Sequence, residues 1–382
     1  MKSFCLAAVL SLLLPLAGLA GESFVYFGTF TGAKSKGIYV SRFDSDSGKL
    51  TAPELAAEIQ NPTFLAVAPG ERFLYAVSEV NQIGDKNTGA VDAFAVDAKT
   101  GKLTLLNQQY SGGPGPCHLS VDATGKCLLV ANYAGGSIAA LPIHADGSLG
   151  EAATFIQHTG SSFNTNRQAG PHAHFIMASP DNHLVLNCDL GLDRVFAYYL
   201  DASAAKLRDT GRVITVAPGS GPRHLVFSAD SRFVYVINEI VGTITVFSYQ
   251  IFADGLSDPA MTEVQTISTM PKDFSGQNTA AEIVLHPSGK FLYASNRGHD
   301  SIALFSVDQK TGRLTFVEHQ STMGRTPRHF AVDPTGHWLM AENQASDSVV
   351  MFAIDQDTGI LKPTVQTLSV GAPVCAVFVD AR

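Results

Sequence analysis

The sequence is poor in cysteine and in charge, and it contains neither a basic run nor a long helical pattern. Charged residues make up 16% of the 382 residues, and the formal net charge is -8. Such a chain, without clustered Lys and Arg, is not expected to bind nucleic acid, because the phosphate backbone attracts basic surfaces. No segment carries the sustained 3.6-residue apolar period of a helix. A hydrophobic fraction of 45% fits a chain that buries a large β core.

The few cysteines do not form a metal-binding motif. Cys5 lies in the amino-terminal apolar segment, so it leaves the chain if that segment is removed. The others could pair in an oxidising compartment, but their spacings fix no connectivity, and free buried thiols are the favoured interpretation. These are Cys117, Cys127, Cys188 and Cys375.

The first twenty residues have the pattern of a secretory signal. Lys2 precedes an apolar run from Phe4 to Leu19, and small residues permit cleavage after Ala20. The run is short for a bilayer span of about 20 residues, which favours a signal over an anchor. We therefore predict that residues 1–20 are removed and that no stable membrane anchor remains. Residues 21–382 are expected to form one domain in the periplasm or outside the cell.

A repeat organises the rest of the chain. Strand-like apolar runs open 46 to 58 residues apart, a spacing typical of four-stranded propeller blades. In six copies a residue of type Asn, Asp or Ser stands sixteen residues after the opening. The openings are Pro62, Pro116, Ala173, Pro222, Ala280, Pro327 and a seventh at Pro373, and the residues sixteen later are Ser78, Asn132, Asp189, Asn238, Asn296 and Asn343.

The seventh copy is split between the two ends of the sequence. Only nine residues follow Pro373, while residues 24–29 match residues 291–296 of the fifth copy. Sharing one blade between the termini closes a ring and removes exposed sheet edges. We therefore predict an all-β fold, a seven-bladed β-propeller whose last blade is closed by strands from both termini. The repeated Asn and Asp are expected to be turn residues that cap backbone, rather than metal ligands.

The same spacing predicts which residues share the mouth of the central channel. The start of the first strand and the end of the second lie side by side in an antiparallel hairpin. The residues after the openings are Thr63, Cys117, His174, Arg223, Ala281, Arg328 and Val374. The next residues along are Phe64, His118, Phe175, His224, Glu282, His329 and Cys375. The residues after the second strand are Glu79, Tyr133, Leu190, Glu239, Arg297, Gln344 and, from the amino-terminal strand, Phe30.

These mouth positions differ in charge from blade to blade, whereas core positions repeat. Acid, imidazole and guanidinium groups are therefore expected to converge on one asymmetric site around the third to fifth blades. Three in-phase histidines could either hydrogen-bond between blades or contact a ligand, and both interpretations stay open. The candidate substrate-binding residues are His118, Tyr133, His224, Arg328 and His329.

Four stretches of the chain resemble the seven-bladed lactonase family, which includes bacterial 6-phosphogluconolactonases and fungal carboxymuconate lactonizing enzymes. They are residues 221–224 (GPRH), 236–239 (VINE), 270–276 (MPKDFSG) and 295–297 (SNR), and the similarity extends from about Phe24 to the end. The resemblance implies a site of one His, one Glu and two Arg. By position these fall on His174, Glu239, Arg223 and Arg297.

The implied residues suit lactone chemistry. Opening a lactone needs an activated water, stabilisation of the carbonyl oxygen and a proton for the leaving ring oxygen. Glu239 or His174 would transfer protons, in an order that the sequence leaves open. Arg223 and Arg297 would stabilise the oxyanion and any carboxylate or phosphate on the substrate.

Other interpretations of these residues remain. His172 and His174 would face the same side of a regular strand, but no third metal ligand is specified and the resemblance implies no metal, so no metal or cofactor is predicted. Glu239 and an Arg could also form a salt bridge without chemistry. The expected function is 6-phosphogluconolactonase-like hydrolysis of a sugar lactone, although an exported enzyme would rarely meet a sugar phosphate. The alternatives are a carboxymuconate-type cycloisomerase and a non-catalytic binding propeller.

Overall fold

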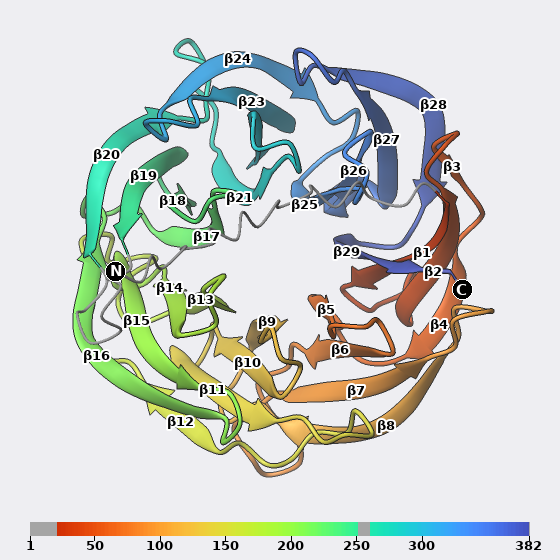
Figure 1. The fold of residues 1–382 in the computed structure, drawn as a ribbon, viewed down its shortest axis with the longest axis vertical. Helices are drawn as coiled ribbons and strands as arrows, with labels where there is room; N and C mark the ends of the chain where they lie inside the picture. Colours follow the sequence, from red (N-terminus) through yellow and green to blue (C-terminus); the bar gives the residue numbers. More distant parts are fainter. Residues whose placement is uncertain (1–20, 251–259, 382) are drawn as a thin grey trace, which may run out of the picture.

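The computed structural model describes residues 21–250 and 260–381. Its strands form seven antiparallel sheets that stand as blades around a central axis (Figure 1). This arrangement confirms the predicted all-β class and the seven-bladed propeller. The predicted signal segment, residues 1–20, lies outside the described residues. Within the described ranges, no helix is long and apolar enough to cross a membrane.

Six blades are four-stranded sheets of consecutive strands, each numbered from the channel outwards. The first holds β5 (Leu65–Val67), β6 (Phe73–Ser78), β7 (Ala90–Val96) and β8 (Leu103–Tyr110), and the second holds β9 (Pro116–Val121), β10 (Cys127–Asn132), β11 (Ser137–Pro142) and β12 (Thr154–Gln157). The third holds β13 (Ala173–Ala178), β14 (Leu184–Asp189), β15 (Arg194–Asp201) and β16 (Lys206–Thr215), and the fourth holds β17 (Pro222–Phe227), β18 (Phe233–Asn238), β19 (Thr243–Gln250) and β20 (Ala260–Ser268). The fifth holds β21 (Thr279–Leu285), β22 (Phe291–Arg297), β23 (Ser301–Val307) and β24 (Leu314–Ser321), and the sixth holds β25 (Pro327–Val332), β26 (Trp338–Asn343), β27 (Ser348–Ile354) and β28 (Leu361–Ser369). A 3-10 turn, η1 (Gln344–Ser346), follows β26.

The seventh blade joins the two ends of the described chain. Its innermost strand is β29 (Pro373–Asp380), which pairs with β1 (Glu22–Thr29), and β1 pairs with β2 (Gly37–Asp44). The outer edge is divided between β3 (Lys49–Leu50) and β4 (Glu54–Glu58). Figure 1 shows β29, in blue, beside β1, in red. The split copy of the repeat is therefore one blade, as predicted.

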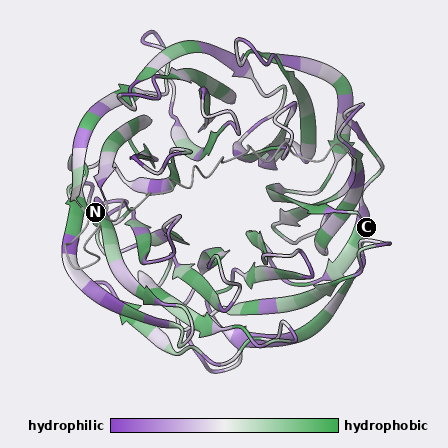
Figure 2. Cartoon of the chain, viewed as in Figure 1, coloured by the Kyte–Doolittle hydropathy of each residue, from purple (hydrophilic) through white to green (hydrophobic). Residues whose placement is uncertain are grey.

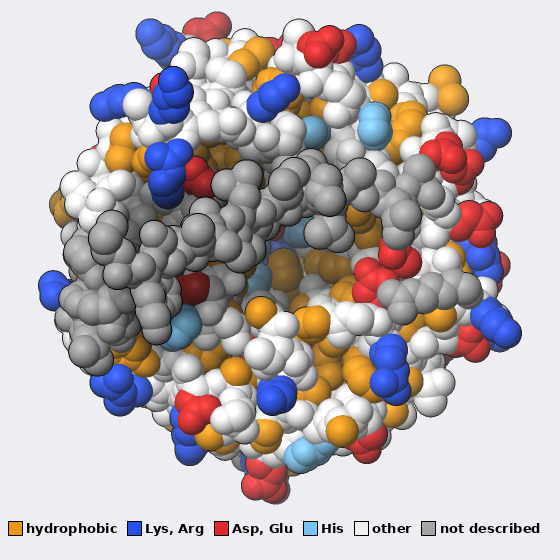
Figure 3. Space-filling view, in the orientation of Figure 1, with side chains coloured by type: hydrophobic (Ala, Val, Ile, Leu, Met, Phe, Trp, Pro, Cys, Tyr) orange, Lys and Arg blue, Asp and Glu red, His pale blue; other side chains and the backbone are white. Residues whose placement is uncertain are grey.

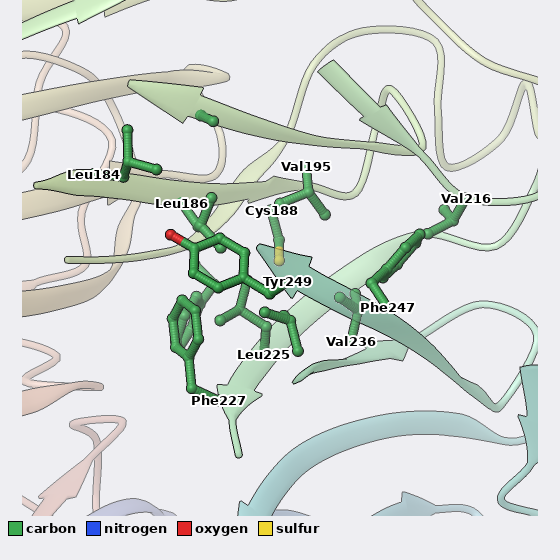
Figure 4. Close-up of a cluster of buried hydrophobic side chains, with 13 residues drawn as sticks. Leu184, Leu186, Cys188, Val195, Val216, Leu225, Phe227, Val236, Phe247 and Tyr249 are labelled. Atoms are coloured by element: carbon green, nitrogen blue, oxygen red, sulfur yellow. The ribbon is translucent and has the colours of Figure 1, made fainter. Parts of the chain in front are cut away.

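The cores lie between neighbouring blades. Between the third and fourth blades, Cys188 and Val195 pack with Val236 and Phe247 (Figure 4). Burying a side chain of this size contributes about 1.5–3 kcal/mol. The outer strands instead alternate between hydrophobic and hydrophilic residues (Figure 2), because only one face of each is covered. Cys117, Cys127, Cys188 and Cys375 are free and buried.

Three of the four repeated Asn residues link blades, which differs from the predicted cap between second and third strands, whereas the amide of Asn238 donates to Thr243 and Thr245 within its own blade. The side-chain amide of Asn132 donates to the carbonyl of Ser111, which directly follows the outer strand of the preceding blade. Asn296 and Asn343 donate in the same way to Thr269 and Thr322. Each amide satisfies a backbone oxygen that has left its own sheet, so the residue is structural for a reason that acts between blades.

A β-bulge at the start of the inner strands sets the direction of the mouth side chains. In β17, Pro222 pairs with Asn238 and His224 pairs with Ile237, so Arg223 is the extra residue. The same shift leaves Cys117, His174 and Arg328 as extra residues in their strands. Bulges re-aim a side chain out of the regular alternation. In these four strands, the side chain of the residue after the opening residue is therefore directed away from the packing between blades.

Candidate active site

The predicted mouth residues surround a cavity of about 300 Å³. Figure 3 shows a hollow at the centre of the ring, with histidine and hydrophobic side chains visible in it. Three of the four predicted catalytic residues, His174, Glu239 and Arg297, line the cavity, and Arg223 lies against Glu239. The complete lining is Glu79, Cys117, Tyr133, Arg167, His174, Glu239, Thr279, Arg297 and Arg328.

Glu239 is the electrostatic centre of the site. It is 5% exposed, and its Oε2 accepts a hydrogen bond of 2.7 Å from Nη2 of Arg297 and lies 3.2 Å from Nε of Arg223. Its Oε1 accepts a hydrogen bond of 2.5 Å from Nη2 of Arg167. Burial alone would raise the pKa of Glu239, but the charges of Arg297 and Arg223 and the hydrogen bond from Arg167 lower it to about 2. The carboxylate therefore stays ionised and fully engaged.

The backbone of the fifth blade holds two of these arginines. Nη1 of Arg223 donates to the carbonyl of Ala281 at 2.7 Å, and Nη2 of Arg297 donates to the carbonyl of Ala280 at 3.1 Å. Burial and the neighbouring charges of Arg297 and Arg328 lower the pKa of Arg223 to about 9. Arg223 therefore remains a cation at neutral pH, with its side chain only 3% exposed.

His174, unlike the charged residues around it, has a neutral side chain. It is 3% exposed, and neither ring nitrogen hydrogen-bonds to a described residue. Burial and the positive charge of Arg223 lower its pKa well below 6.5, so the imidazole is neutral at physiological pH. The ring packs at a steep angle against Tyr133 and His224, with centroid distances of 5.5 and 5.1 Å. His174 is therefore a neutral proton acceptor that no neighbour has occupied.

His172 does not share this position. Its ring stacks on Tyr133 with a centroid distance of 4.5 Å, and its Nδ1 lies 3.0 Å from the Tyr133 carbonyl oxygen. The bulge at His174 breaks the strand alternation on which the idea of a paired metal site depended. Among the described residues, no group of three or more His, Cys, Asp or Glu side chains is arranged to hold a metal ion.

The structure brings Tyr133 and Arg328 to the cavity, but it places His118, His224 and His329 in a layer beneath it. Nδ1 of His224 lies 3.0 Å from Oε1 of Glu282, so this layer contains contacts between blades. Nδ1 of His329 lies 2.8 Å from Oε2 of Glu342, within its own blade. Ring contacts fill the centre of the layer, at 4.2 Å from His118 to both Phe64 and Phe175. His224 and His329 line a separate space of about 10 Å³, which is about enough for one water molecule. Glu79, Cys117 and Arg328 line both this space and the cavity. These histidines form the floor of the site, and a substrate contact from them stays a prediction.

Arg167 is a residue of the site that the repeat does not predict. This residue lies between β12 and β13, outside the sixteen-residue spacing that located the other mouth positions. Its neighbour Gln168 is fully buried, and its Nε2 donates to the Leu190 carbonyl and to Asp193 Oδ1, each at 2.8 Å. Asp193 also accepts hydrogen bonds from the backbone of Gly219 and Gly221, so this loop is tied to the one that precedes β17. The one available signal was a cationic residue in an unusually long connection between blades.

A family model described as "Lactonase, 7-bladed beta-propeller" matches residues 24–378. The chain belongs to this lactonase family. It is 37% identical over 305 residues to a 6-phosphogluconolactonase of Bacillus subtilis, which covers 80% of this chain and 83% of the relative.

Solved structures of lactonases have the same fold as this chain. A putative 6-phosphogluconolactonase from Bacteroides fragilis is 38% identical with a TM-score of 0.86, and the match covers 94% of this chain and 98% of that one. The periplasmic gluconolactonase of Pseudomonas aeruginosa is 34% identical with a TM-score of 0.87, and the match covers 95% and 100% of the two chains.

Proposed function

We propose that this lactonase-family protein hydrolyses a sugar lactone, in the manner of a 6-phosphogluconolactonase, with His174 as the proton-transfer group. The observation that carries the proposal is the contrast inside one cavity. His174 is neutral and unoccupied, whereas Glu239 is ionised and held by three guanidinium groups. A general base must be in its proton-accepting form at the working pH and free to reach the water.

The residues support a balanced two-step reaction. His174 takes a proton from water as the water oxygen bonds to the lactone carbonyl carbon, and the negative charge that forms on the carbonyl oxygen is stabilised by Arg297, with Arg223 behind it. That charge also raises the proton affinity of the buried imidazole as the proton arrives. The intermediate then breaks its ring C–O bond, and protonated His174 returns the proton to the departing oxygen. The product is an open-chain hydroxy acid.

Glu239 has a positioning role in this scheme. A carboxylate with a pKa near 2 is a poor base, because its charge is already stabilised by Arg297 and Arg223. It instead orients the guanidinium groups around the point where the oxyanion forms. Of the two proton-transfer candidates from the sequence, His174 is therefore preferred.

We also propose that residues 1–20 are a secretory signal and that residues 21–382 act as one domain outside the cytoplasm. The family match begins at residue 24, after this segment. The description of the Pseudomonas aeruginosa relative as periplasmic supports the same location.

The first test compares His174→Asn and Glu239→Gln on glucono-1,5-lactone and its 6-phosphate, with the products identified. His174→Asn should lower kcat by about 10²- to 10⁴-fold, the range for losing a general acid–base group. Its Tm should change little, because Nδ1 of His174 has no hydrogen-bond partner among the described residues. Glu239→Gln should lower both kcat and Tm, since it leaves buried Arg223 without its counter-ion.

His172→Asn is the matched control and should keep most of the activity. Full activity of His174→Asn would disprove the assignment. If the purified protein opens no lactone, the non-catalytic binding propeller is favoured instead. A cyclised product from a muconate would indicate a cycloisomerase.

A further inference from the structure

The cavity contains more positive charge than its carboxylates neutralise. Four guanidinium groups, those of Arg167, Arg223, Arg297 and Arg328, lie in or against it. Three of them converge on Glu239. Arg223, which is buried, and Arg297, whose side chain is 11% exposed, are further held by backbone carbonyls. The guanidinium groups that can still bind an anion are therefore those of Arg167 and Arg328.

Arg328 has its guanidinium available. It is the bulge residue of β25, it is partly buried, and it lines the cavity. Its one close ring contact is with Phe30, 5.6 Å from the ring centroid, and it makes no hydrogen bond or ion pair with any described residue. Glu79, on the same cavity wall, hydrogen-bonds to Thr63 instead. Burial raises the pKa of Glu79, although the charge of Arg328 acts in the other direction.

Arg167 is only partly used. Both of its contacts, to Glu239 at 2.5 Å and to the Tyr133 hydroxyl at 3.5 Å, are made by Nη2. Its Nε and Nη1 have no partner among the described residues, and its side chain is 37% exposed. The hydrogen bonds of Gln168 fix the backbone beside it, so the guanidinium is held at the cavity without being buried.

We propose that Arg167 and Arg328 form an anion subsite that selects lactones carrying a phosphate or carboxylate group away from the reacting carbonyl. Guanidinium groups bind such anions through paired charge-assisted hydrogen bonds. This division of roles leaves Arg223 and Arg297, which already hold Glu239, for the oxyanion. The inference rests on the proposed lactone hydrolysis.

The test measures kcat/KM of the wild type, Arg167→Gln and Arg328→Gln on three lactones. These are neutral glucono-1,5-lactone, its 6-phosphate, and a sugar lactone with a carboxylate in place of the phosphate. Each variant should lower the ratio of kcat/KM for an anionic lactone to that for the neutral lactone by about 10- to 100-fold, the effect expected for hydrogen bonds to a charged group. The anionic lactone that loses more identifies the preferred anion.

Arg325→Gln is the matched control. Arg325 lies three residues before Arg328 in the sequence, is exposed, donates to the Ala345 carbonyl and does not line the cavity. It should leave the ratio unchanged. An equal fall for neutral and anionic lactones would overturn the subsite and leave the arginines a structural role. Inorganic phosphate, measured by calorimetry, should bind the wild type more tightly than either variant. Phosphate binding tests the subsite even if the protein opens no lactone. A failure to open any lactone would disprove only the proposed hydrolysis.

Discussion

At the scale of single residues, one group of cations lowers the pKa of two neighbouring side chains, with different results. The guanidinium groups stabilise the Glu239 carboxylate and oppose protonation of His174. Burial strengthens both effects, because little water screens the charges. The residue types alone predict a proton-transfer pair, but only the shared arginines separate the proton acceptor from the fixed anion.

This separation predicts an unusual pH profile. The active form requires neutral His174, and a pKa well below 6.5 delays its protonation as the pH falls. We expect kcat/KM to stay level from about pH 8 to below pH 6.5 and to decrease only well below that pH, whereas an unshifted imidazole would lose half the activity at pH 6.5. The rate should be measured from aldonate product, after subtraction of spontaneous opening. A midpoint at or above 6.5 would contradict the assignment of His174 as base.

At the scale of elements, polar contacts join each blade to the next. A tyrosine of the second strand donates its hydroxyl to a glycine carbonyl in a turn of the following blade, as Tyr293 does to Gly359 at 2.7 Å. Gly359 has a φ of 75°, and a Cβ there would lie 2.7 Å from the Phe291 ring, so the turn requires glycine. Tyr75 makes the same contact with Gly147 and Tyr26 with Gly101.

The fourth blade offers a natural control for this contact. Tyr293→Phe removes the donor and leaves the buried Gly359 carbonyl unpaired, which should cost about 1 kcal/mol of unfolding free energy. Tyr235→Phe should cost much less, because the Tyr235 hydroxyl has no hydrogen-bond partner among the described residues. Urea unfolding of the two variants, followed by circular dichroism, makes the comparison. Equal losses would show that the tyrosine–glycine bond contributes little.

At the scale of the whole molecule, the ring depends on the pairing of β1 with β29. This pairing extends from Ser23–Asp380 to Thr29–Pro373 and brings the two ends of the described chain together. Backbone nitrogen of Ala381 donates to the carbonyl of Glu22 at 3.0 Å. Without β29, the inner edge of β1 and the faces of two neighbouring blades would be exposed to water.

Deleting residues 373–382 should therefore prevent stable folding and promote aggregation. A circular permutant that joins residue 381 to residue 21 and opens the chain in the exposed turn at residues 145–146 should fold, because every strand pair is kept. Size-exclusion chromatography and thermal unfolding would compare the two. A soluble, cooperatively folding truncation would show that six blades close without the seventh.

Much of the site followed from the repeat. The sixteen-residue spacing located His174, Glu239 and Arg297 on one cavity because strand pairing fixes which residues share a mouth. The spacing did not locate Arg167, because this residue lies in an irregular connection between blades that does not follow the repeat. It also left His118, His224 and His329 undecided, because adjacent positions on a bulged strand differ in depth as well as in direction.

The sequence by itself determined the blade count, the join between the termini and the residues gathered at the mouth, because these depend on local pattern and strand pairing. Only the tertiary structure decided the charge state and role of each group. A pKa depends on burial and on every charge nearby. The charges that lower the pKa of Glu239 belong to Arg223, on the same blade, and to Arg297 and Arg167, which lie 58 and 72 positions away in the sequence. The protein's chemistry therefore depends on contacts between blades that no single repeat contains.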